Sequence, residues 1–125
     1  MAEAEQLLRA FGPFGVSVCN GPYGVFKWQK TNMTRIELTD TCIRAVIQLA
    51  FGPFGGRRSR KAPLFEIPYA SIVSTTLLPH PARFGLQQVL DIVYRAGDDT
   101  HEVSIAAYNA PAKEAFAILQ RYAPR

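Results

Sequence analysis

The chain has 125 residues, of which 48% are hydrophobic and 19% are charged, with 14 Lys+Arg against 10 Asp+Glu. This length is typical of one domain and allows a hydrophobic core without disulfide staples. The composition excludes collagen-like, disordered and coiled-coil proteins. The longest apolar runs are far shorter than the roughly 18–20 residues of a membrane-spanning helix. The N-terminus lacks the basic-then-apolar pattern of a signal peptide, so we expect a cytoplasmic protein.

The formal net charge of +4 comes from one short segment. Arg57, Arg58, Arg60 and Lys61 place four positive charges within five residues, and the rest of the chain is formally neutral. A nucleic-acid-binding protein usually spreads its Lys and Arg over a whole face or helix. A nucleic-acid partner is therefore not expected. A nucleic-acid accessory role stays as a third alternative, which a steep salt dependence of binding would reveal.

The first part of the chain changes its hydrophobic period. Residues 3–11 have Ala4, Leu7, Leu8 and Phe11 on one helical stripe, which predicts a short N-terminal helix within residues 1–12, ended by Gly12-Pro13. From residue 16 the pattern alternates, which is typical of strands. Strands are expected at 16–19, 25–30, 35–38 and 42–49, and the tight turn Thr39-Asp40-Thr41 joins the last two into a hairpin.

The second part reads as strands followed by one helix. Segments 64–69 and 71–78 are β-rich, and Pro68 between them indicates an edge strand or a bend. Segments 89–94 and 101–108 form a second hairpin around Ala96-Gly97-Asp98-Asp99. Pro111 then opens an amphipathic helix over 110–122. About seven short strands within 16–108, followed by one late helix, predict a mainly β (α+β) fold in a single domain, 1–125.

Two stretches resemble the pleckstrin-homology superfamily in its bacterial and GRAM-like branches. They are LTDTCI at 38–43 and FEIPYASIV at 65–73, followed by the LDIVY strand at 90–94, a Gly-Asp turn and the terminal helix. The resemblance covers roughly residues 24–122. It implies a PH-like seven-stranded, strongly bent barrel capped by the C-terminal helix, with the N-terminal helix as an addition. It also implies that Ile67 and Ile72 point inward and that Tyr69 covers them.

Lipid-binding members of that superfamily use basic residues of the first hairpin. Here Lys27, Lys30 and Arg35 stand in that region, but Thr34 precedes Arg35 where the pattern has a closing basic pair. The resemblance therefore does not transfer a phosphoinositide site to this chain.

The sequence gives little support to catalysis or metal binding. His80 lies between two prolines, and alternation places His101 and Glu102 on opposite faces of a strand. Cys19 and Cys42 fit as small buried strand residues, are too few for a disulfide scaffold or zinc cage, and have no nearby cations that would activate a thiol. Phosphate loops, nucleophile elbows and dinucleotide motifs are missing from the sequence. We expect neither an enzyme nor a cofactor or metal.

The segment 51–61 is the best candidate for function. Phe51 and Phe54 supply apolar contact, and Arg57, Arg58, Arg60 and Lys61 supply positive charge. Near acidic lipid each cation contributes about 1 kcal/mol, so four alone give only millimolar binding. The alternative is a solvated loop that merely keeps the protein soluble.

These observations predict a non-enzymatic PH-like interaction module that binds a protein, or an anionic lipid or ligand, through its loops. Because a small module often completes its core by self-association, we also expect a homo-oligomer. The alternative is a small-ligand carrier or minor enzyme that uses the barrel interior as a pocket. A large cavity containing His80 or His101 would favour that alternative, and a filled interior would exclude it.

Overall fold

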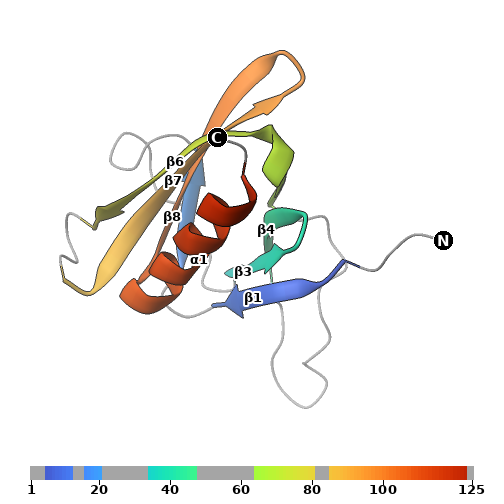
Figure 1. Cartoon of the computed structure of the whole chain (residues 1–125). Coiled ribbons are helices and arrows are strands. Elements are labelled where there is room, and N and C mark those ends of the chain that lie inside the picture. Colours follow the sequence, from blue (N-terminus) through green and yellow to red (C-terminus); the bar gives the residue numbers. More distant parts are fainter. Residues whose placement is uncertain (1–4, 13–15, 21–33, 48–63, 81–84, 124–125) are drawn as a thin grey trace.

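The computed structural model describes residues 5–12, 16–20, 34–47, 64–80 and 85–123. Within them the protein folds into two four-stranded antiparallel sheets and one C-terminal helix (Figure 1). The first sheet has the order β1-β3-β4-β5 and the second β2-β8-β7-β6. The strands are β1 (Leu7–Phe11), β2 (Ser17–Asn20), β3 (Thr34–Thr39), β4 (Cys42–Ile47), β5 (Phe65–Pro68), β6 (Ile72–Pro79), β7 (Gln87–Ala96) and β8 (Asp99–Tyr108).

The first sheet is organised around the predicted β3–β4 hairpin. Its strands alternate buried and half-buried residues, with Ile36, Leu38 and Ile43 fully buried. At the far edge β5 ends at Pro68, and the 3-10 turn η1 (Tyr69–Ser71) leads directly into β6. Pro68 is therefore both on an edge strand and at a bend, as the sequence indicated. Ile67 and Tyr69 are buried, and so is Ile72 at the start of β6.

The second sheet contains the other predicted hairpin, β7–β8. Ala96 pairs with Asp99, so the turn has two central residues, and the first of them, Gly97, has a φ of 66°. Residues other than glycine seldom adopt a positive φ, and glycine at the first central position is typical of type II′ hairpin turns. Strand β6 pairs with β7 and, among the strands of the described residues, is the last one of the sheet.

The helix α1 (Asn109–Tyr122) packs against β6, β7 and β8. Ala112, Ala115 and Leu119 are buried on its inner side, and the two alanines let the helix approach the sheet closely. The core lies between the helix and the two sheets. Apolar side chains from both sheets contribute to it, including Ile36 and Ile43 from the first sheet and Ile92 and Ile105 from the second. The predicted C-terminal helix is thus confirmed.

The predicted N-terminal helix is wrong. Leu7–Phe11 forms β1, which pairs antiparallel with β3, and a register irregularity between Leu7 and Arg9 disturbs the strict alternation of a strand. A strand with such an irregularity does not need strict alternation, so apolar residues with helix-like spacing are compatible with it. A nine-residue helix is marginal by itself, whereas the open edge of β3 offers a full set of backbone partners. Gly12 ends the strand at a φ of 104°, where a Cβ would lie 2.5 Å from the Thr34 carbonyl oxygen.

The predicted seven-stranded barrel is also wrong. The described residues form eight strands in two separate sheets, without closure into a barrel. One of these eight strands is β1, the N-terminal segment for which the sequence predicts a helix. The mainly β character and the two hairpins are as predicted, but segment 25–30 lies outside the described residues. Among the described residues, none of the helical segments has the length and hydrophobicity that a membrane span requires.

Candidate functional site

The residues predicted to form a functional loop lie outside the part of the chain that the structure describes. This applies to Phe51, Phe54, Arg57, Arg58, Arg60 and Lys61, and also to Lys27 and Lys30. Arg35, the third residue compared with the lipid-binding pattern, lies on β3, and its Nε is 3.0 Å from Oε2 of Glu37. The guanidinium of Arg35 is thus already paired with a carboxylate of its own strand.

A cluster of polar side chains occupies the surface of the first sheet, and we call it the Arg44 cluster. Glu37, Arg44 and Glu66 are direct cross-strand neighbours on β3, β4 and β5. Arg44 Nε donates to Glu37 Oε1 at 2.9 Å, and its Nη1 lies 3.6 Å from Glu66 Oε2. Burial lowers the pKa of Arg44, but hydrogen bonds to Glu37 and Glu5 outweigh this effect and raise it overall.

Glu5, just before β1, completes the cluster. Its Oε2 accepts hydrogen bonds from the hydroxyls of Thr41 at 2.6 Å and Thr39 at 2.9 Å, and its Oε1 accepts from Arg44 Nη1 at 3.0 Å. These bonds, with that of Thr41 the largest cause, lower the pKa of Glu5 from 4.5 to about 2. The next residue is fastened to the same turn, because Asp40 and Gln6 exchange backbone and side-chain hydrogen bonds.

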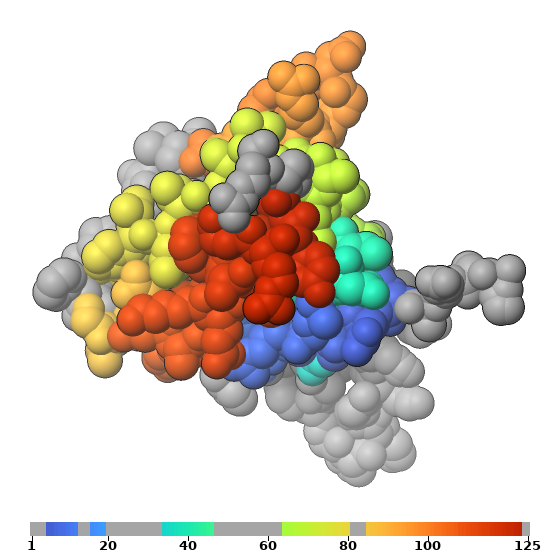
Figure 2. Space-filling view, in the orientation of Figure 1, coloured from blue at the N-terminus to red at the C-terminus, as the bar shows by residue number. Residues whose placement is uncertain are grey.

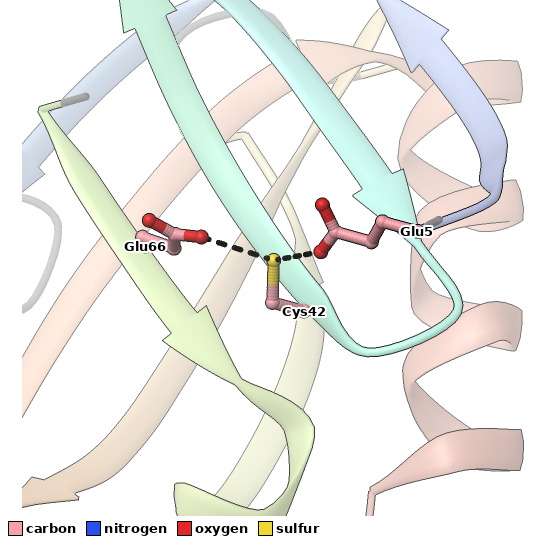
Figure 3. Close-up of side chains that lie close together, drawn as sticks. All are labelled: Glu5, Cys42 and Glu66. Atoms are coloured by element: carbon pink, nitrogen blue, oxygen red, sulfur yellow. Dashed lines mark hydrogen bonds between the residues drawn. The ribbon is translucent and has the colours of Figure 1, made fainter. Parts of the chain in front are cut away.

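The Cys42 thiol lies between two carboxylates of this cluster (Figure 3). Its Sγ is 3.3 Å from an oxygen of Glu5 and 3.7 Å from an oxygen of Glu66. The side chain is buried, and this burial is the main reason why the pKa of the thiol is raised. Two flanking carboxylates also disfavour a thiolate, so Cys42 stays a protonated donor at neutral pH.

Glu5, Cys42 and Glu66 offer three ligand atoms within 4.8 Å of one another, which is close enough to consider a metal ion. Zinc binds such ligands at about 2.0–2.3 Å and requires a deprotonated thiolate. Here Arg44 already lies between the two carboxylates, and the thiol is held in its protonated form. The three residues therefore do not fit a metal in this arrangement. Arg44 offsets part of the negative charge of the three carboxylates, and the cluster links the N-terminal segment to the β3–β4 turn.

The remaining reactive side chains are occupied in other ways. Cys19 is buried on β2, and burial raises the pKa of its thiol to about 11. The ring of His101 stacks on Tyr94 with centroids 5.5 Å apart. His80 is buried just after β6, where its backbone N–H donates to Gln87. Both cysteines are thus buried strand residues, as predicted.

A second candidate site is the free edge of the second sheet. Strand β6 has eight residues, IVSTTLLP, and none of them is charged. Val73 and Leu78 have exposed fractions of 54% and 51%. Among the described residues, β6 pairs with β7 on one side and with no strand on the other. We call this side of β6, together with the adjacent groove between β6 and the end of α1, the β6 edge.

A groove of about 220 Å³ runs between β6 and the end of α1. It is lined by Ile72 to Thr75 on the strand and by Leu119, Gln120 and Ala123 on the helix side. Gln120 Nε2 donates to Thr75 Oγ1 at 2.8 Å and so links the two walls. Figure 2 shows the helix surface and the β6 side chains lying side by side on one face of the molecule.

Sequence reasoning did not identify either site. The Arg44 cluster joins residues 5, 37, 42, 44 and 66, and only the pairing of β3 with β4 and β5 brings them together. The sequence contains one indication of the β6 edge: eight consecutive strand residues without a charge, which is unusual for an edge strand. What the sequence did not show is that this strand lies at an edge.

Comparisons with known proteins leave the family open. No family model matches the chain, and no curated protein matches it either. The resemblance to the pleckstrin-homology superfamily therefore stays a prediction that rests on the motifs at 38–43 and 65–73, the LDIVY strand at 90–94 with its Gly-Asp turn, and the terminal helix.

Proposed function

We propose that this chain is a non-enzymatic interaction module and that the β6 edge takes an extended segment of a protein. One observation carries the proposal: among the described residues, the eight-residue strand β6 has no charge, pairs with a strand on one side only and lies beside a groove. Natural proteins usually protect such edges with lysines, inward-pointing charges or a covering loop, because the unpaired N–H and C=O groups are a template for another strand. An extended partner would satisfy these groups and place a side chain in the groove.

The size of the groove supports a peptide rather than a small molecule. Pockets for small ligands usually measure about 300–1,000 Å³, and this groove has about 220 Å³. Neither His80 nor His101 lines it. The carrier or enzyme alternative depended on a barrel with a histidine in its cavity, and the described residues do not form that barrel.

The chemistry of the described side chains supports a role without catalysis. The thiols of Cys19 and Cys42 are buried with raised pKa values, which makes them poor nucleophiles at neutral pH. Both cysteines are free, which fits the reducing conditions of the cytoplasm. We include a cytoplasmic location in the proposal.

Selection of peptides tests the proposal. Random twelve-residue peptides displayed on phage are selected on the parent protein, and the binding of each selected peptide is then measured by fluorescence anisotropy. We expect peptides that bind the parent and lose at least tenfold in affinity to the Val73→Lys variant, because a lysine at the mouth of the groove must be desolvated when a strand pairs there.

Leu7→Lys is the matched control. Leu7 has an exposed fraction of 48%, close to that of Val73, but it lies on β1 in the other sheet. Peptides should bind this variant as they bind the parent. Binders that tolerate Val73→Lys would show that the β6 edge is not a docking site, and so would a selection without binders on a parent protein that is monomeric.

A further inference from the structure

The β6 edge also indicates which protein segment occupies it, an inference that rests on the proposed function. We infer that the extended segment that pairs with β6 is β6 of a second copy, so that two chains form a two-fold symmetric dimer. The two strands would run antiparallel and join two four-stranded sheets into one continuous sheet of eight strands. The contact is isologous, since the same surface is used by both copies, and it closes because each β6 edge is then occupied.

The register follows from the ends of β6. A bulge lies between Ile72 and Ser74, and Pro79 ends the strand without a backbone N–H, so the regular stretch is 74–78. Its centre is Thr76. Maximal overlap of two such stretches places Thr76 on the two-fold axis, opposite Thr76 of the second copy. Thr–Thr pairs across antiparallel strands are favourable.

The distribution of side chains along β6 fits pairing with itself. In this register Ser74 lies opposite Leu78 of the second copy. Val73, which lies in the bulge, is adjacent to both Leu78 and Pro79 of the second copy. Val73 and Leu78 are the two exposed large apolar residues of the strand, with exposed fractions of 54% and 51%. The antiparallel arrangement therefore places Val73 of each copy beside Leu78 of the other copy at both ends of the paired strands, where the two side chains bury part of each other's surface.

The faces of the strand agree with the same register. Ser74, Thr76 and Leu78 are exposed, whereas Thr75 and Leu77 are half-buried and Leu77 packs against the core. Pairing about Thr76 sets exposed residues opposite exposed residues and places Thr75 opposite Leu77. Because β6 has no charge, the two-fold axis brings no like charges of the two strands together. A foreign peptide has no such built-in match, so we favour the second copy as the occupant.

Two measurements test the dimer. Sedimentation velocity over a range of protein concentrations should show a monomer–dimer equilibrium for the parent and for Leu7→Lys. The Thr76→Lys variant should be monomeric, with a dissociation constant at least a hundredfold weaker, because it sets two lysines opposite each other on the axis. Circular dichroism and thermal unfolding of each variant show whether the chain has kept its fold.

Cross-linking tests the register. We expect Thr76→Cys to form a disulfide-linked dimer under mild oxidation, because residues directly opposite in an antiparallel pair have Cα atoms about 4.5–5.5 Å apart. Ser74→Cys is the matched control on the same strand and the same face. Its counterpart lies four residues away along the junction, so it should not cross-link.

The possible failures are distinguishable. If the parent is monomeric at all concentrations while selected peptides still bind at Val73, the second copy is the wrong occupant and the docking function stands. If the parent is monomeric and peptides do not bind, both proposals are wrong. A dimer that persists in Thr76→Lys, or a cross-link at residue 74 but not at 76, overturns the β6 pairing described here.

Discussion

The hydroxyl of Tyr69 donates a hydrogen bond of 2.6 Å to the backbone carbonyl of Thr39. Thr39 ends β3 in the first sheet, and Tyr69 begins the 3-10 turn that carries the chain into β6 of the second. The ring of Tyr69 also stacks on Tyr122 in α1, with centroids 5.3 Å apart. One buried side chain thus joins both sheets and the helix, and it holds the start of β6 against the end of α1.

Removing this hydroxyl should destabilise the fold without changing its shape. Tyr69→Phe keeps the stacked ring but leaves the buried Thr39 carbonyl without this donor, which costs about 1–3 kcal/mol. We expect a decrease of that size in the free energy of unfolding in urea. Tyr108→Phe is the control, since Tyr108 has an exposed fraction of 49%. Equal stabilities of the two variants would contradict the bridging role of Tyr69.

The Glu5 carboxylate should make stability depend on pH in acid. Its pKa falls from 4.5 to about 2 on folding, so its contribution is complete above about pH 4.5 and is lost as the pH falls towards 2. The Glu5 side chain is about a third exposed (33%), so we expect at most about 1 kcal/mol. The difference in unfolding free energy between the parent and Glu5→Gln should close over that interval.

The control for this measurement is Asp99→Asn in the exposed β7–β8 hairpin, which removes a carboxylate far from the Arg44 cluster. A gap for Glu5→Gln that stays constant from pH 6 to pH 2 would mean that the bonds to Thr41, Thr39 and Arg44 do not hold the carboxylate ionised.

Arg44 should be coupled energetically to the carboxylates around it. Arg44→Gln removes the hydrogen bonds to Glu37 and Glu5 and leaves three carboxylates together, which costs about 1.5–3 kcal/mol. Adding Glu37→Gln should then cost less than it does in the parent, because Arg44 no longer pairs with that carboxylate and only Arg35 still does. A double-mutant cycle of urea unfolding measures this coupling. Strict additivity of the two changes would show that the Arg44–Glu37 pair contributes nothing.

The two cysteines should be unreactive in the folded protein. Both are buried and both thiol pKa values are raised, so few thiolates form at pH 8. We expect labelling by a disulfide reagent to be slow in the native state and complete within the mixing time in denaturant. Fast native labelling of Cys42 would show that its thiol is not protected by Glu5 and Glu66. Cys42→Ser identifies which cysteine reacts.

Several features of the fold were predictable because their determinants are local. The β7–β8 hairpin has alternating strands and a glycine where the turn requires a positive φ. The helix α1 begins near Pro111 and carries an apolar stripe. The β3–β4 turn has Thr39, whose hydroxyl oxygen accepts from the backbone N–H groups of Thr41 and Cys42. In each case neighbouring residues supply both the signal and the interaction.

The errors have a different origin. Leu7–Phe11 has a spacing that fits a helix, but pairing with β3 overrides that local preference. The barrel was expected from short motifs that describe a hairpin and a strand but not how two sheets are connected. The cationic segment 51–61 is a conspicuous feature of the sequence because charge density can be read along the chain, whereas an edge strand can be recognised only once its neighbours are known.

The β-rich class, both hairpins, the terminal helix and the burial of the two cysteines could be predicted from the amino-acid sequence. These follow from periodicity and turn chemistry, which act over a few residues. Three features depend on long-range contacts: Leu7–Phe11 is a strand, Glu5 contacts Arg44 and Cys42, and β6 is the last described strand of its sheet, beside α1. Strand pairing joins residues far apart in the chain, and which strands pair depends on which strand edges and apolar faces are still without a partner.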